Sequence, residues 1–147
     1  AGYTRATGDI DFLVNAEDGG KFKDILQAMG YKVIFEDENV LNLAAPWQLI
    51  GGVDAIWARR KYTLDMLKHA VTGVDGIPVV APEGIIGLKV QAIANDPERY
   101  ARDIADIEWL LRAHTATLDM ALIREYFLAF TMTPELDKLL QRIGHAH

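Results

Sequence analysis

A change in hydrophobic period along the chain limits its fold more than any other feature. Up to about residue 81, short apolar segments rich in strand-forming residues alternate with turns, whereas from residue 82 onward apolar residues recur at helical spacing. Helical patterns at 17–29 and 59–71 interrupt the strands. The expected strands cover 9–14, 31–36, 40–45, 53–58 and 77–81. This order predicts an α/β (α+β) fold, with a mixed sheet of four to five strands packed on helices and a C-terminal helical segment.

The short connection at 37–39 decides what kind of sheet to expect. It separates two predicted strands closely enough for a hairpin, which argues against a purely parallel, doubly wound sheet. The sequence contains no internal repeat or linker. We therefore expect one domain, 1–147, with a sheet-rich core at 1–81 and a helical part at 82–147.

Cap residues mark the expected ends of several helices. Gly30 stands where a left-handed cap would end the first helix, and Thr117 is the expected cap of a helix at 118–130. The first helix is expected to pack through one apolar stripe, because its apolar residues share a helical spacing. The residues of this stripe are Phe22, Ile25, Leu26 and Met29.

The composition narrows the class of protein. Half of the 147 residues are hydrophobic and 24% are charged, as in soluble globular domains. Apolar runs are shorter than the ~20 residues that span a bilayer, and no basic segment followed by an apolar one opens the sequence, so neither a membrane span nor a signal peptide is expected. The absence of cysteine excludes disulfides, thiolate zinc sites and a cysteine nucleophile, and we expect a cytoplasmic location.

The formal net charge of −6 bears on the partners of the protein. It argues against broad nucleic-acid binding, which depends on Lys and Arg neutralising phosphates. It leaves room for a nucleotide, because a metal ion held by acidic residues can bring a polyphosphate to a negative site. A small-molecule enzyme and a protein-binding module are both compatible with this composition.

Two carboxylates in the first predicted strand are the main candidates for chemistry. Asp9 and Asp11 are separated by one residue, so they point to the same face of a strand while Ile10 points to the other. Adjacent like charges repel, and a cation between them relieves the repulsion. Oxygen ligands on a rigid strand suit Mg²⁺. Taken alone the pattern is weak, because most such pairs are ordinary exposed strand or turn residues.

A third acid, Asp54, occurs among apolar residues in the predicted strand 53–58. A charge inside a sheet is costly unless it is paired or bound to metal. If this strand lies beside the first, Asp54 completes a three-carboxylate site for two metal ions, an arrangement suited to phosphoryl transfer. The alternative is that Asp54 caps a turn after Gly51 and Gly52.

Two segments of the chain resemble a known family. Residues 4–14 are similar to the Arg-x-Thr-x-Asp-Ile-Asp segment of the nucleotidyltransferase superfamily, and in particular to the bacterial AbiEii-type branch, which includes toxins of abortive-infection systems. The segment 82–107 resembles the same branch, in which a Leu-Lys helix is followed by a helix with an Arg/Lys-Asp-x-x-Asp pattern. The resemblance covers roughly residues 4–112 and implies a nucleotidyltransferase-like fold.

The resemblance also implies an activity and roles for individual residues. The reaction would be a Mg²⁺-dependent transfer of a nucleoside monophosphate from a nucleoside triphosphate to an unknown acceptor hydroxyl. By position, the metal ligands, with room for two ions, and catalytic residues would be Asp9, Asp11 and Asp54, the last helping to deprotonate the acceptor. The residues near the nucleotide would be Arg5, Thr7 and Lys89.

One departure from the family concerns the start of the sequence. Family members usually carry a helix and a Gly-Gly or Gly-Ser turn before the first acidic strand, whereas eight residues without such a turn precede Asp9 here. Either the chain is a truncated or recombined product, or another segment or subunit supplies this part. Loss of the helix should uncover apolar surface, which association covers, so we expect a homodimer or an obligate protein partner. A catalytically inactive module that binds a partner through the same fold is the alternative, and a metal-dependent phosphohydrolase is a further one.

Lys89 has two interpretations that do not depend on the resemblance. It emerges from the apolar stripe of its predicted helix, so its stem either packs while the ammonium reaches solvent, or the ammonium meets an acid. Asp103 and Asp106 share one side of the next predicted helix. We expect a structural ion pair between Lys89 and Asp103 near the acidic site.

Overall fold

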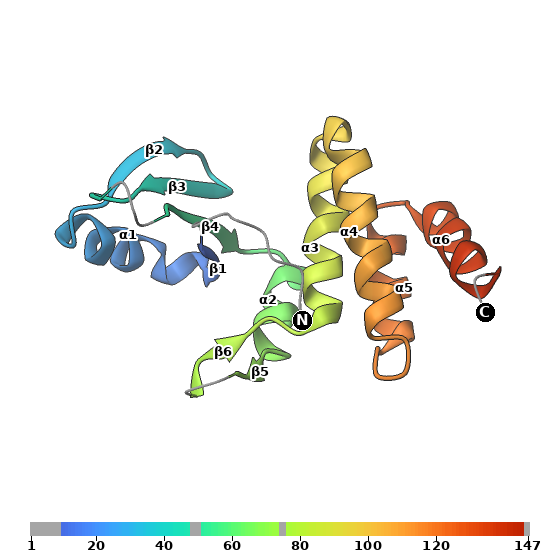
Figure 1. Ribbon diagram of the computed structural model, residues 1–147. Helices are drawn as coiled ribbons and strands as arrows, with labels where there is room; N and C mark the ends of the chain where they lie inside the picture. The colour runs from blue at the N-terminus through green and yellow to red at the C-terminus, as the bar shows by residue number, and fades with distance from the viewer. Residues whose placement is uncertain (1–9, 48–50, 74–75, 146–147) are drawn as a thin grey trace. The chain divides into compact units, whose positions relative to one another are not determined.

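A computed structural model of the protein describes residues 10–47, 51–73 and 76–145 (Figure 1). The chain divides into two compact units, Ala1–Leu67 and Lys68–His147. The first contains a mixed sheet with helices and the second is mainly helical, so the predicted α/β fold class is confirmed. That the whole chain forms one domain stays a prediction.

The first unit alternates strands with short helices, as its hydrophobic pattern predicted. Its sheet has the strand order β1-β4-β3-β2 within the described residues, with β1 parallel to β4 and the other neighbours antiparallel. The predicted hairpin is therefore present. The elements are β1 (Ile10–Asn15), the 3-10 turn η1 (Ala16–Asp18), α1 (Gly19–Ala28), β2 (Lys32–Glu36), β3 (Val40–Ala44), β4 (Val53–Ala58) and α2 (Lys61–Lys68).

Helix α1 covers one face of this sheet (Figure 1). Phe22 and Leu26, one helical turn apart, pack against a core from β3 and β4 that consists of Leu41, Leu43, Val53 and Ala55. The Phe22 ring contacts Phe12 and Trp57 edge to face, at centroid distances of 5.3 and 6.2 Å. Strand alternation leaves the residues between these core positions on the opposite face of the sheet.

The predicted stripe of α1 is only half correct. Ile25 and Met29 are 56% and 58% exposed, although their spacing placed them with Phe22 and Leu26. Met29 is the C-cap residue that follows α1, and neither Ile25 nor Met29 belongs to the core that Phe22 and Leu26 contact.

Local side chains and one glycine shape the turns of this unit. Asp37 closes the β2–β3 turn, because its Oδ1 accepts hydrogen bonds from the backbone N–H groups of Asn39 and Val40, at 2.7 and 2.8 Å. Gly30 has φ of 97°, which confirms the left-handed cap after α1. The pairing of β2 with β3 contains a bulge between Val33 and Phe35.

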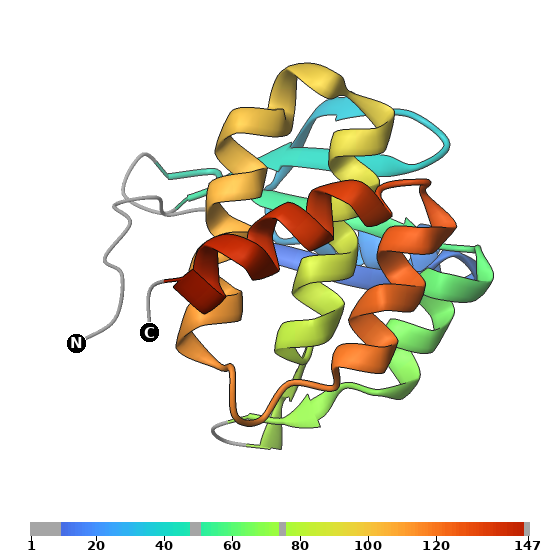
Figure 2. The same ribbon diagram turned by 90° about the vertical axis from the view of Figure 1, so that its right-hand side faces the viewer.

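The second unit begins with a small hairpin and continues with helices. β5 and β6 form a separate antiparallel sheet, so the sheet-rich part does not extend to residue 81 as one sheet. Figure 2 shows α6 lying across the other helices of this unit. The elements are β5 (Val71–Thr72), β6 (Pro78–Val79), α3 (Pro82–Asn95), the 3-10 turn η3 (Pro97–Arg99), α4 (Tyr100–Ala113), α5 (Met120–Ala129) and α6 (Thr133–His145).

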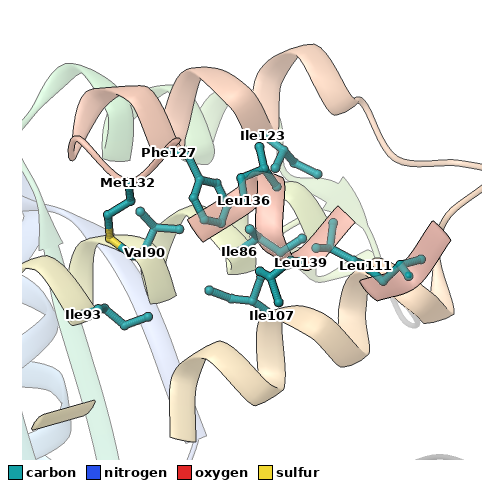
Figure 3. Packing of buried hydrophobic residues seen from close by; sticks show 11 residues of the cluster. Ile86, Val90, Ile93, Ile107, Leu111, Ile123, Phe127, Met132, Leu136 and Leu139 are labelled. Carbon is teal, nitrogen blue, oxygen red and sulfur yellow. The ribbon is translucent and has the colours of Figure 1, made fainter. Parts of the chain in front are cut away.

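The four helices of this unit share one hydrophobic core (Figure 3). Each helix contributes apolar residues three or four positions apart, which is the spacing that the sequence predicted. The buried residues are Ile86, Val90, Ile93, Ile107, Leu111, Ile123, Phe127, Met132, Leu136, Leu139 and Ile143. None of the described helices has the length and hydrophobicity needed to cross a membrane.

The cap of α5 differs from the prediction. Asp119, and not Thr117, precedes the helix, and its Oδ1 accepts a hydrogen bond from the Leu122 N–H at 3.1 Å. The Thr117 hydroxyl instead donates to the carbonyl oxygen of His114, at 3.3 Å. Both threonine and aspartate cap helices, so the residue type alone could not identify the cap. The helix begins at Met120, which makes Asp119 the capping residue.

Candidate functional site

Two of the three predicted acids lie next to each other on the sheet. Asp11 on β1 and Asp54 on β4 are register partners in the parallel pair, so their Cα atoms lie about 4.8 Å apart and their side chains share a face. The expectation that the strand of Asp54 lies beside the first strand is confirmed. Asp9 lies outside the described residues, as do Arg5 and Thr7.

Asp54 is held by a residue that the sequence analysis missed. Asn42 lies opposite Asp54 in the antiparallel β3–β4 pair, and its Nδ2 donates a hydrogen bond to Asp54 Oδ1 at 2.6 Å. Asp54 is thus an interior residue of β4, and the alternative that it caps a turn is wrong. The signal that was available is an amide in the middle of the apolar alternation of β3, between Leu41 and Leu43.

The alternation of β4 explains why these polar groups face away from α1. Val53 and Ala55 are buried on the face that α1 covers, so Asp54 between them must point to the other face. There Asp54 and Asn42 are half-buried and Asp11 is exposed. The carboxylates are therefore fixed by the sheet on one side and accessible on the other.

The donor set of this face fits Mg²⁺. Within the described residues, no group of three or more His, Asp or Glu side chains gathers around one point, so the part of the site present there is the Asp11–Asp54 pair. Mg²⁺ typically uses one or two carboxylates, with phosphate oxygens and water completing its coordination. Asn42 donates one hydrogen bond to Oδ1 of Asp54, so lone pairs of this carboxylate remain for a cation or an acceptor.

Lys89 lies in a cluster of charges in the second unit. Its Nζ is 3.6 Å from Oδ1 of Asp103, which confirms the predicted ion pair, and 3.0 Å from Oδ2 of Asp106. The side chain of Asp103 is 1% exposed, and its Oδ2 also accepts a 2.8 Å bond from Nε of Arg99. A buried carboxylate needs such partners, and Lys89 of α3 supplies one of them to Asp103 of α4. The role of Lys89 toward a nucleotide stays a prediction.

Replacing Lys89 with methionine is expected to lower the free energy of unfolding by about 1–3 kcal/mol, because the buried Asp103 and the half-buried Asp106 both lose a cationic partner while the apolar stem is kept. The matched control is Arg102→Met. Its guanidinium is 3.9 Å from Asp103, with a side chain that is 57% exposed, so the change should stay within about 0.5 kcal/mol. Urea unfolding followed by circular dichroism measures both, and equal effects would contradict the structural role of Lys89.

Comparison with known proteins gives one family match. A family model described as nucleotidyl transferase AbiEii toxin, type IV TA system, matches residues 50–143, which is more than half of the chain. The matched segment contains Asp54, Lys89 and Asp103 and begins after Asp11. No match was found among curated proteins.

Proposed function

The chain belongs to the AbiEii nucleotidyl transferase toxin family, and on this premise we propose that it transfers a nucleoside monophosphate from a nucleoside triphosphate to an acceptor hydroxyl, with Mg²⁺ as cofactor. The observation that supports the proposal is the pairing of Asp11 with Asp54 on an accessible face of the sheet. A cytoplasmic location and a protein partner of the antitoxin kind belong to the same proposal.

The acids of this face would hold the cofactor. Asp11 and Asp54, together with Asp9 from the same predicted strand, supply the carboxylate oxygens that Mg²⁺ prefers. When bound, the metal offsets the charge of the triphosphate and of the developing transition state. Without a cation, the adjacent carboxylates would repel the phosphates, so nucleotide binding should depend on Mg²⁺.

The proposed reaction needs one proton acceptor. The acceptor oxygen forms a bond to the α-phosphorus, the bond from that phosphorus to the bridging oxygen of the β-phosphate breaks, and pyrophosphate leaves with the electron pair. The proton of the acceptor hydroxyl passes to the carboxylate of Asp54, which keeps free lone pairs beside the hydrogen bond from Asn42. The hydrogen bond from Asn42 also keeps the carboxylate in one orientation, which favours proton transfer at a defined position.

Three further residues are assigned to the nucleotide in this proposal. Arg5 and Thr7 precede the first acidic strand and would contact the triphosphate, and Lys89 would contribute its ammonium. Arginine and lysine supply charge-assisted hydrogen bonds to phosphate oxygens. With a net charge of −6, the chain needs such local cations, in addition to the metal, to hold a polyphosphate.

Calorimetry with each of the four nucleoside triphosphates tests the proposal. We expect heat of binding for at least one nucleotide in the presence of Mg²⁺, and its loss when the metal is chelated, because the acidic face cannot hold phosphates alone. A thermal shift under the same conditions is the second measurement. Absence of both signals with all four nucleotides would contradict the proposal.

Exposed apolar residues favour a second candidate, a module that retains the fold and binds a protein without catalysis. Ile25 of α1, Met29 at the C-terminal cap of this helix and Ile34 of β2 are between 56% and 69% exposed, and exposed apolar surface is often covered by association. This candidate predicts a homodimer or an obligate complex. Light scattering that shows a stable monomer at micromolar concentration would exclude the homodimer.

A further inference from the structure

Register partners on four strands of the sheet form a row that ends in an aromatic ring. Asp11 is opposite Asp54, Asp54 is opposite Asn42, and Asn42 is opposite Phe35. Residues that are directly opposite each other share a face of the sheet. The row therefore runs from carboxylate through amide to a phenyl ring at the β2 edge, on the face opposite α1.

A bulge in β2 is the reason why Phe35 belongs to this row. Val33 lies opposite Leu43, a core residue of the face that α1 covers. Simple alternation would return Phe35, two residues later, to the same covered face. The register shift between Val33 and Phe35 instead places Phe35 opposite Asn42, on the face of the acids. Bulges occur often beside active sites, where they redirect a side chain.

The ring of Phe35 is accessible in this position. The residue is 51% exposed, although a phenyl ring gains free energy when it is removed from water. Beside it, Asn42 uses one N–H for Asp54 and keeps a second N–H and its Oδ1 for other partners. An exposed ring next to an amide offers a stacking surface and directional hydrogen bonds to the same ligand.

We propose that Phe35 and Asn42 form the acceptor subsite, and that the acceptor carries a planar ring close to its reacting hydroxyl. The inference rests on the proposed function, in which Asp54 accepts the proton of that hydroxyl. The strand spacing puts the Cα atom of Phe35 roughly 10 Å from that of Asp54, a span that a sugar with an attached base can cover. The triphosphate takes the other end of the row, at Asp11.

The probe for this subsite is 2-aminopurine riboside, a fluorescent alcohol that bears a planar ring. It is titrated into the full chain in the presence of Mg²⁺ and a nonhydrolysable analogue of the nucleoside triphosphate that binds in the calorimetric test. Stacking on Phe35 should quench its fluorescence. Phe35→Leu keeps an apolar side chain but removes the ring, and should weaken riboside binding by about tenfold and abolish the quenching. Phe35→Tyr should retain both riboside binding and quenching. Ribose, which has no planar ring, should not compete with the riboside.

Calorimetry of the Mg²⁺–nucleotide complex with the same variants separates the outcomes. We expect nucleotide affinity to be unchanged in Phe35→Leu, whose exposed position leaves folding intact. If Phe35→Leu binds the riboside as tightly as the wild type, the acceptor subsite is overturned. The same holds if the wild type binds the nucleotide but not the riboside. In both cases the proposed function stands. If Phe35→Leu loses affinity for the nucleotide as much as for the riboside, the ring contacts the base of the nucleoside triphosphate, and the inference is overturned. A wild type that binds no nucleotide overturns both proposals.

Discussion

Replacing Asp54 with asparagine is expected to slow nucleotidyl transfer by between about 100-fold and 10,000-fold, the range that a positioned general base contributes. The change removes the proton acceptor and one anionic metal ligand. It keeps the shape of the side chain, and the new amide oxygen can still accept the hydrogen bond from Nδ2 of Asn42. The rate of transfer is measured with a nucleoside triphosphate labelled in its α-phosphate, as the label that becomes attached to the acceptor.

Thermal unfolding and a charge-matched control accompany this measurement. The stability of Asp54→Asn should be equal to or above that of the wild type, because the repulsion between adjacent carboxylates is removed. The control is Asp24→Asn, which removes the same charge from an exposed position on α1. It should leave transfer unchanged. Transfer by Asp54→Asn within tenfold of the wild type would rule out Asp54 as the base.

Phe127→Ala should be the most destabilising single truncation in the helical core, by about 3–5 kcal/mol. The ring is fully buried between the helices of the second unit (Figure 3). Its loss removes apolar contacts and leaves a cavity that close-packed neighbours fill only in part. Since natural domains are stable by only about 5–15 kcal/mol, this is a large share of the total.

The neighbouring residue provides the control for Phe127. Leu128 is adjacent in the same helix but 69% exposed, so Leu128→Ala should change the free energy of unfolding by no more than about 0.5 kcal/mol. Urea unfolding followed by circular dichroism at a helical wavelength measures both variants. If the two substitutions cost the same, the packing assigned to α5 is wrong.

The family match and the sheet geometry support the functional proposal at different points of the chain. The matched segment starts at residue 50 and contains Asp54, but not the first acidic strand. The register of β1 against β4 connects the two, because it brings Asp11 from outside the match to the side of Asp54. A calorimetric test on this chain therefore examines a site that the family match covers only in part.

Much of the local structure could be predicted from the sequence. The β2–β3 hairpin, the left-handed Gly30 and the helices of the second half follow from short-range patterns, and the structure confirms them. The ion pair of Lys89 with Asp103 was also predictable, since both lie at defined positions on predicted helices. Each of these features depends on residues a few positions apart or on one helical face.

Other features depended on contacts that local patterns do not encode. Ile25 and Met29 share a helical spacing with the partly buried Phe22 and Leu26 but remain exposed, because spacing alone does not show which members of a stripe contact the sheet. The hydrogen bond from Asn42 to Asp54 could be foreseen only with the register of β3 against β4. The place of Phe35 depends on a bulge, and one extra residue in a strand transfers a side chain to the other face.

By itself the sequence determined where strands and helices form and which residues alternate along them, as in Val53, Asp54 and Ala55, because periodicity, caps and turns act over short distances. Tertiary structure alone decided that Asp54 stands beside Asp11 and opposite Asn42. Strand order and register arise from the burial of whole faces against α1, and that burial is a property of several segments packed together.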